Sequence, residues 1–421
     1  MSTRKSLFLG MLAGLVLLSI TACGLYQIPS INRSMSWRLD AMAAYIRGII
    51  RPVESFSLPV EDNKEPFFES QDMVSDLVIQ ESPDSIQKNA IVAPTITPGE
   101  QLPTRVILPS PSYETQDWNN CGPVTLSHYL RFYGWQGNQF DVSSDVKPVR
   151  SDRNVNVDEL VNYVIDNNLS LSAIYRVGGD VDLLRAMIAE GFPVMIEVSV
   201  LFEDRFWVND DRWSGHYLLV TGYDDERSLF VVQDPLLGAD KLVGYNELEQ
   251  SWQPFNRVYL LLFPPDQMDK IKNLLGDEWD VELNRKNALQ TSISETKNQP
   301  DNAFAWFNLG TNYAYFQRYA EAADAYDQAW AIGLPQRMLR YQFGPFLAYF
   351  HSNRFEDLQS IVEYALQITP NSEEALLWEG WLLYRMGDKQ KALDSFHKAL
   401  EMKPGYRDAS YAINYVQNGQ G

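Results

Sequence analysis

Between residues 102 and 265 the apolar positions follow two different periods. Three segments come first, with apolar residues at helical spacing and Gly, Pro or Asn at their ends, at 122–133, 157–167 and 181–190. Four runs rich in Val, Leu and Tyr and bounded by turn residues follow, at 193–200, 216–224, 228–235 and 257–263. We therefore expect helices followed by a group of strands, the order typical of an α+β domain.

From residue 302 to residue 421 the pattern changes to paired amphipathic helices that repeat. Gly310 and Ala322 in one copy correspond to Gly380 and Ala392 in another, and the two alanines lie 70 residues apart. This distance is twice a unit of about 34 to 35 residues, the period of tetratricopeptide repeats. A weaker copy lies around Tyr349. We expect three such repeats, a capping helix at 405–417, and a helical connector over 266–301.

The first 26 residues carry the pattern of an export signal. Arg4 and Lys5 precede a charge-free apolar run over residues 7–20. Residues 20–23 resemble a bacterial lipobox, in which Cys23 would carry the lipid. The alternative is an uncleaved anchor, since residues 6–26 are just long enough to span a bilayer. In both cases the positive charge stays inside, and we expect the rest of the chain outside the cytoplasm and tethered to the cell membrane.

Residues 27–101 separate this signal from the α+β domain. Apolar residues at roughly helical spacing, with arginines among them, predict a short juxtamembrane amphipathic helix up to about residue 50. From about residue 52 to residue 103, Glu, Asp, Ser and Pro are frequent and no period is sustained. We interpret this part as a mostly disordered acidic linker.

The net charge of the chain limits the kinds of partner that we expect. The 421 residues include 55 acidic and 35 basic ones, a formal net charge of −20. Such a chain would be repelled by phosphates, so we expect no nucleic acid partner. The sequence also contains no HExxH motif and no Cys/His cluster with metal-ligand spacing. We therefore expect neither a metal nor a cofactor.

Two cysteines occur in the whole chain, Cys23 and Cys121. If Cys23 is lipidated or lies in the membrane, Cys121 has no partner for a disulfide. Exported domains usually pair their cysteines, so a lone thiol favours a working cysteine. Cys121 also stands where a helix begins, and unpaired N–H groups at a helix start stabilise a thiolate.

Four histidines are available as a base for this thiol. His128 lies two turns along the same helix, about 10 Å away, so we expect a structural role for it. His216 opens one predicted strand and Asp234 closes the next, so a hairpin would bring the two together, and the carboxylate would orient the imidazole. Gln116, five residues before Cys121, is a candidate oxyanion donor together with the backbone N–H of Cys121.

Two tryptophans, Trp207 and Trp213, flank the approach to His216. They would either line a cleft beside the imidazole or anchor a loop on the domain surface, and both interpretations stay open.

Residues 102–265 resemble the papain-like peptidases of the bacteriocin-processing, double-glycine leader peptidase family, in its stand-alone C39-like form. The resemblance rests on Gln116, on CGP at 121–123, on GHYLLVTGYD at 215–224 and on DP at 234–235. It implies an α+β papain-like cysteine peptidase domain followed by an all-α tetratricopeptide repeat domain. It also implies Cys121 as the nucleophile, His216 as the general base and acid, Asp234 as its orienting group, and Gln116 as the oxyanion donor.

Two features depart from the family pattern. One residue fewer separates Gln116 from Cys121 than is usual, and no Gly-rich loop ending in Gly-Lys-Ser/Thr is present. Cleavage after a double glycine during export is therefore not carried over to this chain.

The sequence as a whole favours a membrane-tethered extracytoplasmic cysteine peptidase. Its substrate would be a peptide or protein, and the repeats would bind a protein partner in their groove. Two alternatives remain. The same side chains serve a papain-like amidase or acyltransferase, and an inactive α+β domain would leave a scaffold built on the repeats.

Overall fold

The computed structural model of the chain describes residues 39, 42–43, 45–56, 58, 102–148, 154–202 and 211–418. The predicted signal or anchor at 1–26, with Cys23, and most of the predicted acidic linker lie outside the described residues, as does Trp207. Within the described ranges, every helix is too short or too polar to cross a bilayer.

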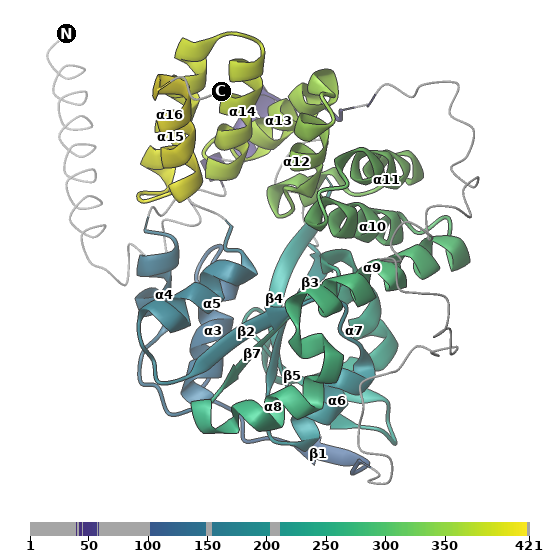
Figure 1. Cartoon of the computed structure of the whole chain (residues 1–421). Coiled ribbons are helices and arrows are strands. Elements are labelled where there is room, and N and C mark those ends of the chain that lie inside the picture. Colours follow the sequence, from purple (N-terminus) through teal and green to yellow (C-terminus); the bar gives the residue numbers. More distant parts are fainter. Residues whose placement is uncertain are drawn as a thin grey trace, which may run out of the picture.

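An antiparallel sheet of seven strands forms the centre of the first domain (Figure 1). Six strands follow the order β2-β7-β3-β4-β5-β6, and β1 pairs with β4. The strands are β1 (Arg105–Ile107), β2 (Ser172–Arg176), β3 (Val194–Leu201), β4 (Trp213–Asp224), β5 (Leu229–Asp234), β6 (Gly238–Gly244) and β7 (Tyr259–Phe263).

The sheet is covered by helices on both faces because its central strands are apolar on both faces. Met195 and Leu219 pack with helices α3 (Cys121–Phe132), α4 (Gln139–Val146) and α5 (Val157–Asp166). Ile196 and Leu218, one residue along, pack with α6 (Val181–Ala189), α7 (Tyr245–Trp252) and α8 (Met268–Leu275). Successive side chains of a strand point to opposite faces, so a continuous apolar run places two cores, one on each side.

Local signals account for the helix ends. Asn156 and Glu159 form a capping box at the start of α5, and Gly134 follows α3 with a φ of +89°. The predicted helices at 122–133, 157–167 and 181–190 are confirmed within two residues as α3, α5 and α6. The four predicted strands correspond to β3, β4, β5 and β7. The prediction omitted helices α4 and α7 and strands β1, β2 and β6, so it gave the sheet too few strands.

The second domain consists of helix pairs joined to the first domain by α9 (Val281–Asn298). Gly310 and Gly380 allow close approach within a pair, because a Cβ there would lie 2.7 Å from the Tyr326 ring and 2.3 Å from the Phe396 ring. The helices are α10 (Ala303–Tyr315) with α11 (Tyr319–Ile332), α12 (Gly344–His351) with α13 (Phe355–Ile368), α14 (Glu373–Arg385) with α15 (Lys389–Met402), and then α16 (Arg407–Asn418).

Part of the predicted acidic linker is ordered on the repeats. Val53 is buried, and the Phe56 ring meets Trp330 of α11 and Tyr364 of α13 edge-on, with centroids 5.1 and 5.4 Å apart. The side-chain amide of Gln336 also donates to the Phe56 carbonyl (2.8 Å). The prediction of disorder from residue 52 is therefore wrong for residues 52–56, because Val53 and Phe56 pack their apolar side chains against the repeats.

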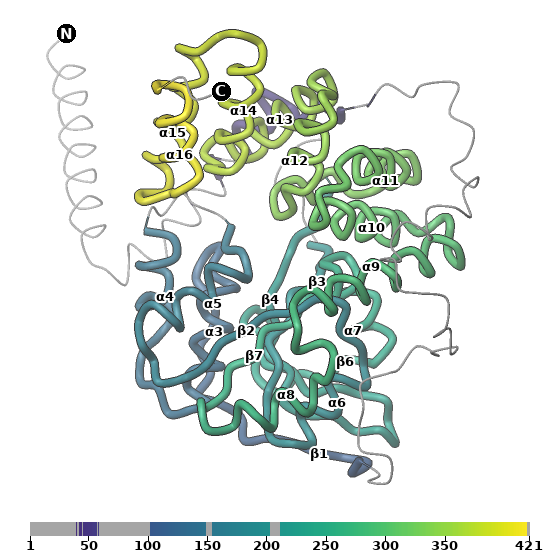
Figure 2. The backbone as a smooth tube through the Cα atoms, viewed as in Figure 1, coloured from purple at the N-terminus to yellow at the C-terminus, as the bar shows by residue number. Residues whose placement is uncertain are grey.

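The two domains share one apolar cluster. Figure 2 shows the repeat helices lying across the end of the sheet where β4 begins. There Trp213 stacks on Phe255 (5.5 Å) and meets Tyr341 of the repeat domain edge-on (5.7 Å). Trp213 is 3% exposed. Trp213 therefore neither lines a cleft nor anchors a loop on the surface. It is part of the apolar core between the two domains.

Candidate active site

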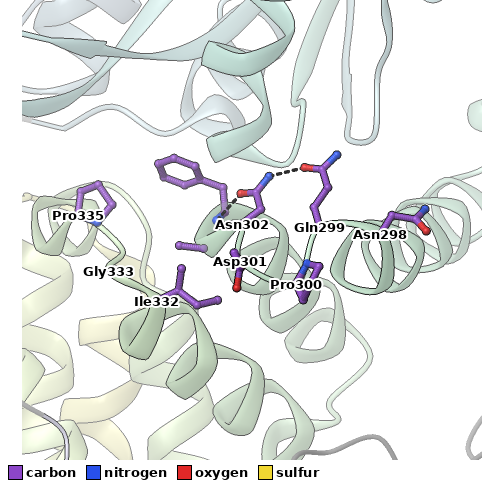
Figure 3. A pocket seen from close by; sticks show the side chains of 10 residues that line it. Asn298, Gln299, Pro300, Asp301, Asn302, Ile332, Gly333 and Pro335 are labelled. Carbon is purple, nitrogen blue, oxygen red and sulfur yellow. Dashed lines mark hydrogen bonds between the residues drawn. The ribbon is translucent and has the colours of Figure 1, made fainter.

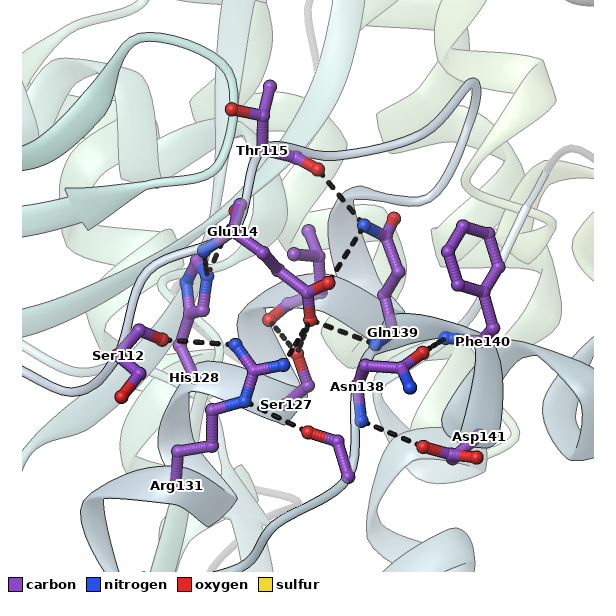
Figure 4. Close-up of polar contacts among 12 residues, drawn as sticks. Ser112, Glu114, Thr115, Ser127, His128, Arg131, Asn138, Gln139, Phe140 and Asp141 are labelled. Carbon is purple, nitrogen blue, oxygen red and sulfur yellow. Dashed lines mark hydrogen bonds and ion pairs between the residues drawn. The ribbon is translucent and has the colours of Figure 1, made fainter. Parts of the chain in front are cut away.

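A network of side chains holds the loop that leads into Cys121 (Figure 4). The Glu114 carboxylate accepts hydrogen bonds from Ser127 (2.8 Å), from Arg131 (2.8 Å) and from the backbone N–H of Gln139 (2.9 Å). His128 belongs to the same network, since its Nε2 accepts from the backbone N–H of Glu114 (3.0 Å). Burial lowers the pKa of His128 to about 4. This histidine therefore supports the loop, in agreement with the role expected for it.

Gln139, at the start of α4, fixes the last residues before the thiol. Its Oε1 accepts from the backbone N–H of Asp117 (2.7 Å) and from the side-chain amide of Asn120 (2.8 Å). Asn120 is the residue immediately before Cys121, the first residue of α3. These hydrogen bonds therefore fix the position of Cys121 at the start of α3.

His216 and Asp234 meet because β4 and β5 form an antiparallel hairpin. His216 lies near the start of β4 and Asp234 ends β5, and His216 Nε2 donates to Asp234 Oδ1 at 2.9 Å. The same Oδ1 accepts from the backbone N–H groups of Leu236 (2.8 Å) and Leu237 (3.1 Å). Both partners of the pair are buried. The carboxylate is thus held by three donors and fixes the orientation of the imidazole.

Cys121 lies on the other side of the imidazole. It is a free, half-buried thiol, and the His216 imidazole lies close enough to lower the pKa of this thiol. Because Nε2 is occupied by Asp234, the nitrogen facing the sulfur is Nδ1. The structure therefore brings together Cys121 of α3, His216 of β4 and Asp234 of β5, although Cys121 lies more than 90 residues before the other two in sequence.

The electrostatics of these three groups favour a thiolate beside an imidazolium. Burial alone would raise the pKa of Cys121, but the hydrogen bond and charge of His216, with Lys147 and the Gly122 N–H, lower it below 9.0. Burial would lower the pKa of His216, but Asp234 and Cys121 raise it to about 9. Burial opposes ionisation of Asp234 too, yet the His216 hydrogen bond leaves its pKa lowered.

Gln116 lies beside the same strand end. Its backbone N–H donates to the Pro235 carbonyl (2.9 Å), directly after Asp234. Its side-chain Oε1 is buried and has no hydrogen-bond partner among the described residues. The residue is therefore tied to the triad by its backbone, while its side-chain oxygen stays unengaged.

Two residues near the thiol were not found from the sequence. Lys147 contributes positive charge, and its ammonium donates to the Asn119 carbonyl (2.7 Å). Glu197 lies beside Tyr217, and burial raises the pKa of this carboxyl well above 4.5. A glutamate inside the apolar run PVMIEVSV was the one available signal, because buried carboxylates are rare without a specific partner. Lys147 carried no such signal.

A small cavity adjoins the thiol, and a larger hollow lies far from it. The cavity beside Cys121 has a volume of about 20 Å³, and Glu197, Gly215, Tyr217 and Tyr341 are among the residues that line it. The larger hollow, about 680 Å³, lies between the start of α10 and the end of α11 (Figure 3). It is lined by Asn, Gln, Pro and apolar side chains with one carboxylate, Asp301, and by no Cys, Ser or Thr.

Comparisons with known proteins find matches to both domains of the chain. The Peptidase C39 like family matches residues 107–260, and the tetratricopeptide repeat family matches residues 373–406. Human protein O-mannosyl-transferase TMTC3 is 27% identical over 161 residues, covering 35% of this chain. Its mouse counterpart is 27% identical over 164 residues, again 35% of this chain. The match spans 18% of the length of either curated relative.

Solved structures with similar parts include two peptidases. A putative C39-like peptidase from Bacillus anthracis is 18% identical, with a TM-score of 0.31, and the match covers 38% of this chain and 97% of that one. The peptidase domain of Streptococcus ComA is 15% identical, with a TM-score of 0.29, over 37% of this chain and 99% of that one.

The family match over residues 107–260 coincides with the sheet domain that carries Cys121, His216 and Asp234. The match over residues 373–406 coincides with α14 and α15. The chain therefore carries a C39-like domain of the papain-like α+β type fused to a tetratricopeptide repeat domain.

Proposed function

We propose that this chain is a membrane-tethered, extracytoplasmic cysteine peptidase that hydrolyses peptide bonds through Cys121, His216 and Asp234. The observation that carries the proposal is the Cys121 thiol beside the His216 imidazole, which Asp234 holds through a 2.9 Å hydrogen bond. A nucleophile paired with a base, and a base oriented by a third group, is the arrangement that acyl transfer requires.

In the first half of the reaction, the Cys121 thiolate attacks the carbonyl carbon of the peptide bond, and a C–S bond forms. The negative charge passes to the carbonyl oxygen, for which the Cys121 N–H and the Gln116 side-chain amide are the proposed donors. The imidazolium of His216 then gives its proton to the departing nitrogen, and the C–N bond breaks. The products of this half are an amine and a thioester on Cys121.

In the second half, water attacks the thioester. Neutral His216 takes a proton from that water, the C–S bond breaks, and the proton is held again by the imidazolium beside the thiolate. Asp234 keeps the imidazole oriented throughout and stabilises its charged form. No group outside the chain is needed to balance either step.

The tether and the partner belong to the same proposal. Residues 1–26, with a lipidated Cys23 or an uncleaved apolar segment, would hold the chain at the outer face of the cell membrane. The repeats would bind a protein or peptide, because stacked helix pairs of this type present an extended concave surface.

Cleavage of peptides tests the activity directly. The full chain in detergent is incubated with a diverse peptide mixture in water enriched in ¹⁸O, and new termini are identified by mass spectrometry. We expect cleavage with one ¹⁸O in each new carboxylate, and no cleavage by Cys121→Ala, which leaves the fold intact. Cleavage that continues in Cys121→Ala would refute the proposal.

Transfer of the acyl group to an acceptor other than water is a second candidate function. The thioester on Cys121 can be attacked by an amine or a hydroxyl as well as by water. The same experiment separates the two, because transfer would join the acyl fragment to another molecule without adding ¹⁸O.

A further inference from the structure

The link between α11 and α12, residues 336–341, belongs to the repeat domain but lies on the C39-like domain. Arg337 anchors it: its side-chain Nε donates to the Trp213 carbonyl (2.8 Å), and its backbone N–H donates to the Asp211 carboxylate (3.1 Å). The Arg337 side chain is 1% exposed. Since Trp213 begins β4, the link is fastened three residues before His216.

Tyr341, at the end of the link, covers the strand beside the imidazole. Its hydroxyl is 2.6 Å from Ser214 Oγ. Its ring packs on Gly215, the residue before His216, since a Cβ on Gly215 would lie 3.1 Å from Tyr341 Cδ1. The same Cβ would lie 2.9 Å from Phe255 Cζ, so a side chain at position 215 would crowd both rings.

Arg340 connects the link to the loop that precedes Cys121, on the other side of the site. Its guanidinium donates to the side-chain oxygen of Asn119 (3.0 Å), two residues before Cys121. Further along the repeats, Glu374 accepts from the side-chain amide of Asn156 (3.2 Å), at the start of α5. The repeat domain therefore holds both walls between which a substrate would lie: the Cys121 side and the His216 side.

The space left at the thiol is too small for a peptide. The cavity that Cys121 shares with Gly215, Tyr217 and Tyr341 has a volume of about 20 Å³. A volume of that size holds one water molecule. For attack, a carbonyl carbon must come within about 3–3.5 Å of the sulfur, and it brings its neighbouring residues with it. Among the residues that line this cavity, Tyr341 is the one that belongs to the repeat domain.

We propose that residues 336–341 are an intramolecular plug, and that a peptide reaches Cys121 only after Tyr341 and Arg340 have left the two walls. The inference rests on the proposed peptidase function and adds its regulation. The contacts that must break include the Tyr341–Ser214 hydroxyl pair, the edge-on contacts of the Tyr341 ring with Trp213 and Phe255, and the Arg340–Asn119 hydrogen bond, while the Arg337 anchor stays buried. A protein that binds the repeats and shifts this link would switch the enzyme on.

The rate at which N-ethylmaleimide labels Cys121 tests the plug, read from the Cys121 peptide by mass spectrometry in the full chain. We expect Tyr341→Ala to raise the rate at least tenfold and Arg340→Ala severalfold, at a temperature well below thermal unfolding. The matched control is Tyr411→Ala on α16, where the tyrosine is 63% exposed and far from the link in sequence. This control should leave the rate unchanged.

The same assay distinguishes a failure of the plug proposal from a failure of the proposed catalytic triad. Equal rates in wild type, Tyr341→Ala and Arg340→Ala would overturn the plug, whatever His216→Ala does. A rate that rises in both variants, but does not depend on His216 at any pH, would refute the proposed catalytic pair and leave the blocked access established. If Tyr341→Ala fails to fold, Arg340→Ala decides the question, because Arg340 contacts the other wall.

Discussion

The charge of Asp234 is what should keep His216 protonated at neutral pH, and replacing Asp234 with Asn removes that charge while keeping the shape. The Asn side chain still offers an oxygen to the backbone N–H groups of Leu236 and Leu237, which lie 2.8 and 3.1 Å from the present Oδ1. The hydrogen bond from His216 also remains possible. What changes is that an ionic acceptor becomes a neutral one.

The size of the effect follows from the difference between the two kinds of hydrogen bond. A bond to a charged group contributes about 1.5–3 kcal/mol and a neutral one about 0.5–1.5 kcal/mol. The difference, about 1–2 kcal/mol, corresponds to about one pKa unit or slightly more. The pKa of His216, raised to about 9 in the folded protein, should therefore fall to about 8. At pH 8 the imidazole would change from mostly protonated to about half protonated.

Nuclear magnetic resonance of ¹³C-labelled histidine rings measures this pKa. The chain contains four histidines, so His216→Ala assigns the resonance of interest. Asp225→Asn is the matched control, because Asp225 follows the opposite end of the same hairpin and is bonded to Arg185 and Tyr245 instead. It should leave the His216 midpoint in place. A wild-type midpoint near 6.5, or a midpoint that Asp234→Asn does not move, would refute the reasoning.

Three further substitutions test the packing around the site by urea unfolding. Glu114→Gln removes the charge that pairs with Arg131 and should lower the free energy of unfolding by about 1–3 kcal/mol; no change would mean that the network does not hold the loop. Gly310→Ala places a Cβ 2.7 Å from the Tyr326 ring and should cost about 1–3 kcal/mol, and an unchanged midpoint would contradict the close approach. Phe56→Ala should destabilise the repeats by about 2 kcal/mol, whereas a neutral result would mean that residues 52–56 are not held there.

Elements with a strong local signal could be predicted from the sequence. Cys121 begins a predicted helix, and His216 and Asp234 lie side by side at the open end of a hairpin whose strands are apolar and whose turn is polar. Helix starts and hairpins are short-range features, so residues placed at their ends can be paired without knowing the rest of the fold. This is why the relation of these three side chains was accessible at the outset.

Weakly apolar elements escaped prediction. Helix α4, with the sequence QFDVSSDV, has too few apolar residues for a clear period, although Asn138 and Asp141 form its capping box. Strand β6, GADKLVG, lies at the edge of the sheet with most of its side chains in solvent, so alternation is weak. In both cases pairing with a neighbouring element stabilises the structure, and a local pattern does not report that.

The contacts that close the site depend on long-range packing. Tyr341 and Ser214 are 127 residues apart, and Arg340 and Asn119 are 221 apart. The link that carries Tyr341 and Arg340 reads in sequence as an imperfect junction between two repeats. Its role becomes visible only when the repeat domain is placed on the sheet domain.

The most direct test of the central claim is the rate of Cys121 alkylation by iodoacetamide at pH 6, in wild type and in His216→Ala. We expect wild type to label at least ten times faster than the variant, because the imidazolium lowers the thiol pKa and because both proteins keep residues 336–341 over the site. The two rates should converge at alkaline pH, where any thiol ionises. Labelling that rises only near pH 9 in both proteins would contradict the account, because Cys121 would then be an ordinary thiol.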